Sequence, residues 1–307
     1  MLIRAFAAGV SALVALAALE ATIAARPCAA AVIGVPPGIG TLQVAIDAAS
    51  PGDELHLLGG IYTGAVVVDK SVGIYCYAVT NLCVIDAICT APIVVDVGAT
   101  DVTIASKNGM IFIIGATATE MRIADSYNVK LTNLQLGLAH LTPCGTEATG
   151  LEIAASDKVK AFNVVSGHAA YIHDIAAGAH VTLGRLTQFF NDDFSGAAVL
   201  IENSSGTVQI LKGFYGTGSD GADPDEVIFQ LTNSDGVRIK SSTLSTSGDP
   251  GVVGILLDAS SDKNRISRNR WVDDMNGAVP YVDNGTHNCA KKNFSDPGST
   301  PFPNLCP

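Results

Sequence analysis

IADSYNVKLTN, residues Ile123–Asn133, carries the pattern that repeats along this chain. It contains an apolar strand end, a small polar corner and an alternating strand. Five later segments repeat this pattern: IAASDKVKAFN (Ile153–Asn163), IAAGAHVTLGR (Ile175–Arg185), IENSSGTVQILK (Ile201–Lys212), LTNSDGVRIKS (Leu231–Ser241) and the more polar LDASSDKNRISR (Leu257–Arg268). Repeats that cannot bury an apolar face alone must stack on one another, so the pattern predicts a solenoid.

The spacing of the repeats indicates which solenoid forms. The anchor positions of the alternating strands are Val102, Val129, Val159, Val181, Val208, Val237 and Asn264. One turn therefore takes roughly 22 to 30 residues, which fits three short strands and three corners, whereas a propeller blade needs about 40 residues or more. Helical signals are almost absent after residue 50, which excludes βαβ units and leucine-rich repeats. We therefore predict a single-domain, all-β protein with a single-stranded, right-handed parallel β-helix.

Alternation within each strand assigns side chains to the inside or the outside. Val129 and Leu131 should point into the core, while Lys130 between them should point to solvent. The same alternation recurs in the later repeats. Neighbouring coils should lie about 4.8 Å apart, the spacing of hydrogen-bonded strands.

A helix is predicted before the first repeat. In the sequence that begins at Thr41, TLQVAIDAASPGDELHLLGGIYTG, one helical face carries Leu42, Ala45, Ile46 and Ala49. Ser50-Pro51-Gly52 ends this helix, and a strand follows from Glu54 to Leu58. We expect residues 41–62 to form an N-terminal cap and first strand, 63–285 the β-helix, and 286–307 a C-terminal tail. Such caps cover the open end of a solenoid.

The segment from Met1 to Ala25 has the layout of a secretory signal peptide, with cleavage as late as Ala31. Arg4 precedes an apolar stretch from Ala5 to Leu19, which is short for a membrane span. We expect a secreted or periplasmic protein that has no contact with the membrane after signal removal.

The seven cysteines suit an oxidising compartment, and none shows CxxC spacing. We expect disulfides, with Cys289 to Cys306 stapling the C-terminal tail. A second pair is expected among the clustered Cys76, Cys83 and Cys89, and the remaining connectivity stays open.

The net charge of the chain limits the classes of partner that it can bind. The chain has 18 Lys and Arg residues against 29 Asp and Glu, a net charge of −11. This balance disfavours nucleic acids and anionic membranes. It also disfavours a polyanionic carbohydrate, unless the few basic residues are concentrated in one groove. The sequence leaves the oligomeric state open.

A family resemblance rests on the cap and the repeats. The segment TLQVAIDAASPGDELHLLGGIY resembles the N-terminal cap and first coil of secreted right-handed parallel β-helix proteins of the pectin-lyase-like superfamily. The later repeats are similar to the generic repeats of that superfamily, so the resemblance covers about residues 40 to 285. It implies the fold but no single activity, because the superfamily includes polysaccharide lyases, glycoside hydrolases, esterases, epimerases, adhesins and tailspikes.

The resemblance suggests a comparison with polygalacturonase-type hydrolases, which carry an aspartate cluster, a Gly-His motif and an Arg-Ile-Lys strand. The matching residues here are Gly167-His168, Asn191-Asp192-Asp193 and Arg238-Ile239-Lys240. The histidine precedes the aspartates, which reverses the order of that family, and the repeat alone accounts for Arg-Ile-Lys.

A smaller acid/base site, without the full polygalacturonase motif, is still compatible with the sequence. His168 follows one coil, and Asp192 and Asp193 follow the next, so an acid/base site is predicted from these three residues, with Arg238 and Lys240 as ligand contacts. The alternative is a solvated corner with a hydrogen-bonded histidine.

Two segments interrupt the repeats, Gly137 to Gly150 and Tyr215 to Glu226, and we expect loops inserted at corners. The second contains a candidate Ca²⁺ site of four acidic residues without EF-hand spacing: Asp220, Asp223, Asp225 and Glu226. The alternative is a solvated acidic loop, and no cofactor is required. We interpret His173 and His180 as surface residues rather than metal ligands.

The sequence favours a secreted β-helix that binds or processes an extracellular polysaccharide or cell-surface glycan on its outer face. If it is an enzyme, it is a polysaccharide hydrolase or lyase. The alternative is a non-catalytic extracellular protein with a structural, adhesive or binding role, which the poor match to every specific motif favours.

Overall fold

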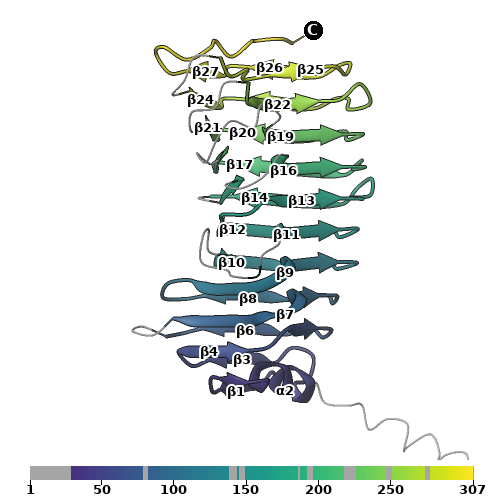
Figure 1. The fold of residues 1–307 in the computed structure, drawn as a ribbon. Coiled ribbons are helices and arrows are strands. Elements are labelled where there is room, and N and C mark those ends of the chain that lie inside the picture. The colour runs from purple at the N-terminus through teal and green to yellow at the C-terminus, as the bar shows by residue number, and fades with distance from the viewer. Residues whose placement is uncertain are drawn as a thin grey trace, which may run out of the picture. The chain divides into compact units, whose positions relative to one another are not determined.

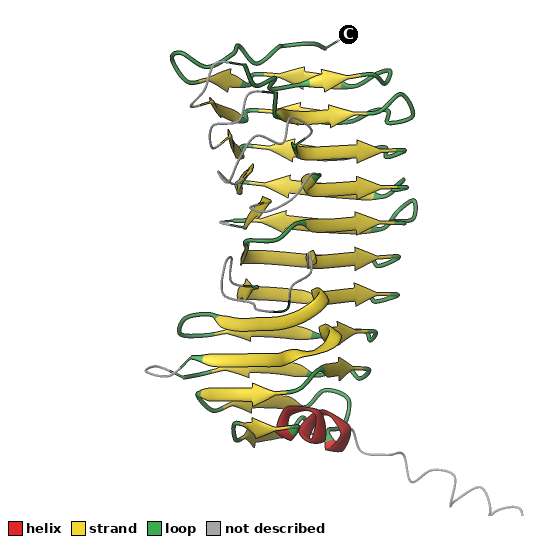
Figure 2. Cartoon of the chain, viewed as in Figure 1, coloured by secondary structure: helices red, strands yellow, loops and turns green. Residues whose placement is uncertain are grey.

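The computed structural model describes residues 29–78, 82–137, 144, 149–185, 187–191, 196–217, 226–246, 251–273 and 277–306. Residues 32–307 form one compact unit. This unit is a parallel β-solenoid whose successive turns stack on one another (Figure 1). Figure 2 shows that strands dominate and that α2 (Thr41–Ala48) is the one helix of the described part.

Each turn contributes strands to three columns of parallel strands. The first column contains β1 (Val32–Val35), β3 (Glu54–Leu57), β6 (Gly73–Cys76), β8 (Thr103–Ser106), β14 (His180–Gly184), β17 (Thr207–Leu211), β20 (Arg238–Lys240), β23 (Arg265–Ser267), β26 (Cys289–Lys291) and the first parts of β10 (Lys130–Leu136) and β12 (Val159–Ser166).

The second column contains β2 (Gly38–Ile39), β4 (Gly60–Thr63), β15 (Gln188–Asn191), β18 (Phe214–Thr217), β21 (Thr243–Thr246), β24 (Arg270–Asp273), β27 (Phe294–Ser295), the first parts of β7 (Cys83–Val97) and β9 (Ile111–Ala124), and the second parts of β10 and β12. The third column contains β5 (Val66–Val68), β11 (Thr149–Ala154), β13 (Ala170–His173), β16 (Ala197–Glu202), β19 (Val227–Thr232), β22 (Val253–Leu257), β25 (Val282–Asp283) and the second parts of β7 and β9.

The strand register confirms the alignment of the repeats. Val181 pairs with Val159 on one side and with Val208 on the other, as their positions in the repeats predict. Val129 and Leu131 are buried, whereas Lys130 is exposed. The periodicity of the sequence therefore fixes both the coil length and the inward face.

A ladder of serine side chains explains the polar corner that recurs in the repeats. The backbone N–H of Ser204 donates to Ser234 Oγ over 3.3 Å, and that of Ser234 donates to Ser261 Oγ over 3.1 Å. Ser126 and Ser156 form the same contact in earlier turns. Because these serines are buried, the ladder satisfies backbone groups that water cannot reach.

The first turn of the solenoid is covered by a helix, and the strand columns continue further toward the C-terminus than predicted. At the N-terminal end, α2 buries Leu42 and Ile46, and it ends before Ser50, as predicted. At the other end, β26 and β27 extend the first two columns through Ser295, past the expected boundary at residue 285. The extension is favoured because Asn288 and Asn293 accept backbone N–H donors of the turn beneath them.

Three disulfides connect the described cysteines. The expected pair Cys289–Cys306 is present, and the clustered cysteines supply Cys76–Cys83. The third, Cys89–Cys144, joins β7 to a segment between the second and third columns.

Both predicted insertions lie between the second and third columns, and most of their residues are outside the described ranges. The predicted signal peptide, Met1 to Ala25, also lies outside them. Among the described residues, no helix is long and apolar enough to cross a membrane.

Candidate functional site on the third column

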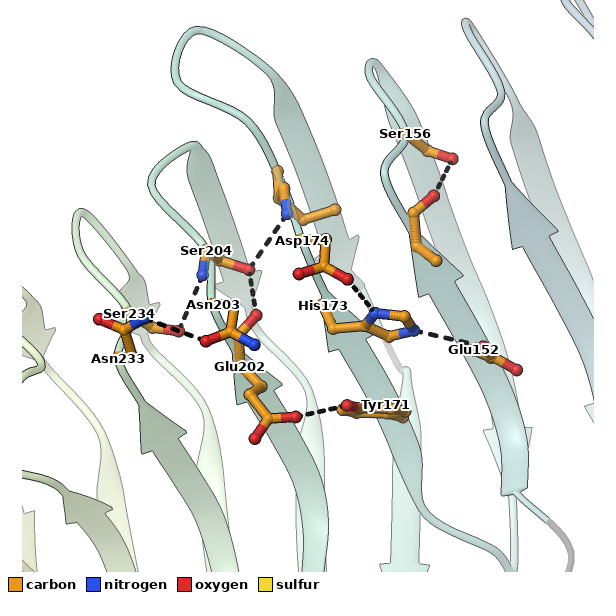
Figure 3. Close-up of polar contacts among 12 residues, drawn as sticks. Glu152, Ser156, Tyr171, His173, Asp174, Glu202, Asn203, Ser204, Asn233 and Ser234 are labelled. Atoms are coloured by element: carbon orange, nitrogen blue, oxygen red, sulfur yellow. Dashed lines mark hydrogen bonds and ion pairs between the residues drawn. The ribbon is translucent and has the colours of Figure 1, made fainter.

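Three neighbouring strands of the third column place polar side chains on one outer face (Figure 3). Glu152 of β11 lies in register with Tyr171 of β13, and His173 of β13 lies in register with Glu202 of β16. These residues alternate with buried aliphatic ones, so their side chains point outward. We call Glu152, Tyr171, His173, Asp174 and Glu202 the third-column cluster.

His173 joins two carboxylates of the cluster. Its Nδ1 lies 2.9 Å from Asp174 Oδ2, and its Nε2 lies 3.2 Å from Glu152 Oε1. The His173 side chain is 18% exposed and that of Glu152 is 22% exposed, so water reaches both only in part. A neutral imidazole can donate to one of the carboxylates, whereas an imidazolium donates to both.

Tyr171 packs against His173 and bonds the next coil. The two rings are stacked with their centroids 4.3 Å apart, and the Tyr171 hydroxyl donates a hydrogen bond to Glu202 Oε2. Burial, followed by the hydrogen bond and the charge of Glu202, raises the pKa of Tyr171 to about 12. The phenol is therefore protonated at neutral pH and acts as a hydrogen-bond donor to Glu202.

An ion pair borders the cluster on the side of the earlier turns. Arg122 donates to both carboxylate oxygens of Asp96, over 3.0 and 2.6 Å. The hydrogen bond with Asp96 raises the pKa of Arg122, and Glu152 contributes to the same direction. This face holds four carboxylates (Asp96, Glu152, Asp174 and Glu202) and one guanidinium, so it repels polyanions and admits a neutral ligand.

The arrangement can support acid/base chemistry. Glu152 and Glu202 lie on strands two coils apart and are offset by two residues along the strands, a backbone separation of roughly 12 Å, and both side chains reach toward β13 between them. Inverting glycosidases hold their two carboxyl groups about 6.5 to 9.5 Å apart, with space for the substrate and a water molecule. The cluster thus has the two carboxyl groups that this reaction uses, and the stacked rings of Tyr171 and His173 lie between them.

His168 lies at the corner between β12 and β13, where its backbone N–H donates to Ser166 Oγ over 3.0 Å. A Cβ placed on Gly137 would lie 2.7 Å from His168 Nε2 and 3.6 Å from Glu120 Oε1, so the ring adjoins a buried carboxyl. Its predicted partners Asp192 and Asp193 are outside the described residues. The acid/base hypothesis for these three residues stays a prediction.

The other predicted contacts lie elsewhere. Arg238 and Lys240 are exposed on the outer face of the first column, where they line a cavity of about 460 Å³. Glu226 is 6% exposed, and the other three residues of the predicted Ca²⁺ site, Asp220, Asp223 and Asp225, are outside the described ranges.

The third-column cluster was not predicted, because His173 was interpreted as a surface residue. His180 is indeed 58% exposed and lies near Asp157, but His173 is largely covered by its partners. Alignment of the third-column strands would have placed these residues on one face, since the strand AYIH aligns with LEIA before it and VLIE after it.

Comparisons with known proteins reveal similarity in fold alone. No family model matches the chain, and no curated protein sequence matches it. A solved structure of pectate lyase Pel9A is 16% identical, with a TM-score of 0.48, 86% of this chain covered and 79% of the other. An alginate lyase from Paenibacillus sp. str. FPU-7 is 13% identical, with a TM-score of 0.46 and coverages of 87% and 96%.

The surface adhesin PfbA of Streptococcus pneumoniae is 12% identical, with a TM-score of 0.34 and coverages of 81% and 87%. Such distant similarity carries no information about activity. The chain has a parallel β-helix architecture because its own strands pair in three parallel columns.

Proposed function

We propose that this protein is an extracellular enzyme that cleaves a neutral polysaccharide on the outer face of its third column. Glu152 and Glu202 serve as the two carboxyl groups, and Tyr171 and His173 bind and orient them. The three disulfides support an oxidising location outside the cytoplasm.

One observation carries this proposal: side chains from three successive coils join in a single network on an outer face. Glu152 contacts His173, the His173 ring stacks on Tyr171, and Tyr171 donates to Glu202. Clusters of ionisable side chains that contact one another on an accessible face are typical of acid/base sites. An open sheet face also lets a polymer chain pass across several coils.

The test is an assay for new reducing ends after incubation of the purified protein with neutral and acidic polysaccharides. We expect products from a neutral polymer, and we expect Glu152→Gln and Glu202→Gln each to lower kcat by about 100-fold or more. Asp69→Asn is the matched control, because Asp69 is an exposed acid outside the cluster, and its rate should equal that of the wild type.

A second candidate function is glycan binding without catalysis. It is favoured by the fact that both ring nitrogens of His173 and the hydroxyl of Tyr171 already contact carboxylates of the chain. If no polymer yields new ends while a neutral glycan still binds and Tyr171→Ala abolishes binding, the enzymatic proposal is wrong and the binding function stands.

A further inference from the structure

The basic residues of this acidic chain gather on the outer side of the first column. From β10 onward, ten of the 18 Lys and Arg residues lie on its outward positions or at the corner that follows it, and all ten are exposed. We call them the basic face: Lys130, Lys160, Arg185, Lys212, Arg238, Lys240, Arg265, Arg268, Lys291 and Lys292.

Part of the basic face surrounds a cavity of about 460 Å³. Six of its ten lining residues are cations, and none is an Asp or Glu. The lining residues are Gln209, Leu211, Arg238, Lys240, Arg265, Ser267, Arg268, Cys289, Lys291 and Lys292. In a chain with a net charge of −11, this segregation creates a local field opposite in sign to that of the whole molecule.

The cations of the basic face lack acidic partners in the described part of the chain. Among the described residues, none of the ten forms an ion pair with a carboxylate. Elsewhere, Arg122 and Arg270 each make two hydrogen bonds to an aspartate, and Lys70 donates to the last carbonyls of α2. The charge of the basic face is therefore available to a ligand.

The register places like charges next to one another. Arg238 lies directly opposite Arg265, and Lys130 lies directly opposite Lys160, in adjacent strands about 4.8 Å apart. Like charges at such positions destabilise a sheet. The repeat requires only a polar residue there, because Thr182 occupies the same position in another turn. The repulsion thus has no structural purpose within the chain.

The corner after the first column also carries positive charges at positions where another residue type is more favourable. One residue per turn has a left-handed backbone there, with φ of 59° at Asn133 and 53° at Asn163. Asn suits this conformation better than a long side chain. Even so, Arg185 (47°), Lys212 (57°) and Arg268 (57°) occupy it in later turns. The chain accepts a less favourable residue and presents a positive charge.

We propose that the basic face is a second, non-catalytic binding site for an acidic polysaccharide whose chain runs along the solenoid axis across successive coils. The residues from Lys130 to Lys291 span seven coils, or roughly 29 Å, so the ligand is an extended polymer with repeated anionic groups. Arg side chains bind carboxylate and sulfate groups through paired hydrogen bonds.

A polysaccharide fits the cavity better than a single-stranded nucleic acid does. Nucleic acid sites of that kind combine cations with aromatic side chains on which bases stack. The lining of this cavity contains no aromatic residue. The site is also separate from the third-column cluster, whose carboxylates repel a polyanion, so it anchors the protein to an acidic matrix and leaves the cluster accessible.

The test measures binding of the full-length mature protein to polygalacturonate, dextran sulfate, neutral dextran and oligothymidylate by calorimetry at several salt concentrations. We expect both acidic polysaccharides to bind and dextran to show no binding at the basic face. Arg238→Gln combined with Arg265→Gln should weaken binding about tenfold or more and lower the log–log salt slope by up to about two.

The matched control removes two exposed lysines from another corner, by Lys158→Gln combined with Lys263→Gln, so that net charge changes equally. The control should bind within about twofold of the wild type. Equal weakening in both variants, no binding of either acidic polysaccharide, or tighter binding of oligothymidylate would overturn the proposal. The thermal midpoint of the Arg variant should be unchanged or higher, since a like-charge contact is removed.

Failure here is distinguishable from failure of the proposed enzyme. The reducing-end assay with a neutral polymer reports on the third-column cluster, and the Arg238 and Arg265 variant should retain that activity in full. Loss of activity on the neutral polymer in this variant would contradict the separation of the two sites.

Discussion

Among single residues, Glu120 is an ionisable group whose burial disfavours its charged form. Among the described residues, it is a fully buried carboxyl, and its Oε2 accepts the backbone N–H of Ala116 over 3.3 Å. Burial raises the pKa of Glu120 from 4.5 to about 7, against the opposing effect of the backbone hydrogen bonds. The side chain therefore holds its proton in the folded protein under mildly acidic conditions.

This shift predicts a pH-dependent stability. Between pH 4.5 and 7 the folded protein binds the proton of Glu120 more tightly than the unfolded chain does, so the free energy of unfolding falls as pH rises through that range. The shift corresponds to about 3 kcal/mol between pH 4 and pH 8. Glu120→Gln should remove this contribution, as measured by urea unfolding at both pH values. The same pH dependence in both proteins would contradict the prediction.

The third-column cluster shows which features of a site follow from the sequence and which do not. Each of its strand residues occupies an outward position, which the alternation predicts. The contacts of Glu152 with His173 and of Tyr171 with Glu202 depend on which strands become neighbours and on the direction in which long side chains extend. The alternation of polar and buried residues predicts the face of the sheet on which a side chain lies, but not the direction in which that side chain extends. The positions of the cluster residues were therefore predictable, whereas the contacts between them were not.

At the scale of elements, buried polar ladders hold the corners together. Ser234 accepts a hydrogen bond from the N–H of Ser204, and its one hydroxyl proton is shared between the carbonyls of Thr232 at 2.9 Å and Ile201 at 3.2 Å. At the last repeat, Asn264 replaces the aliphatic anchor yet is fully buried, because it accepts from Val237 and donates to Ser234. The last repeat is polar at this position because the Asn264 side chain forms buried hydrogen bonds with the turn before it.

The serine ladder can be tested by Ser234→Ala. The substitution leaves the buried N–H of Ser204 without its acceptor, which should lower the free energy of unfolding by about 1 to 3 kcal/mol. Ser260→Ala is the control, because the Ser260 hydroxyl bonds Asp258 at an exposed position, and its effect should stay within about 0.5 kcal/mol. Equal effects in urea unfolding would show that the ladder contributes nothing specific.

At the scale of the whole molecule, the repeat length determines the columns and the inward face. The distribution of charge over the faces follows from the register of distant turns. Arg238 and Lys240 alternate with an inward Ile239, and on that ground they looked like mere copies of the repeat. Only the stacking of successive coils shows that cations accumulate beside them while carboxylates accumulate on another column. Net charge averages over both faces and conceals the separation.

The C-terminal disulfide provides a test of how stability is distributed along the solenoid. Cys289–Cys306 closes a loop with a sequence separation of 17, and the tail that it holds buries Phe302, whose ring stacks on Tyr281. Loss of a disulfide in a loop of this size destabilises by about 3 kcal/mol. Each turn of a solenoid contacts only its neighbours, so the effect of Cys306→Ser should be concentrated at that end.

Hydrogen exchange is the appropriate measurement for this variant. We expect faster exchange of the amides in β24, β26 and β27, and unchanged protection in β3, β6 and β8 at the far end. The second end serves as an internal control, since it carries its own disulfide, Cys76–Cys83. A uniform loss of protection along all three columns would mean that the solenoid unfolds as a single cooperative unit, in which case the C-terminal cap stabilises the whole molecule.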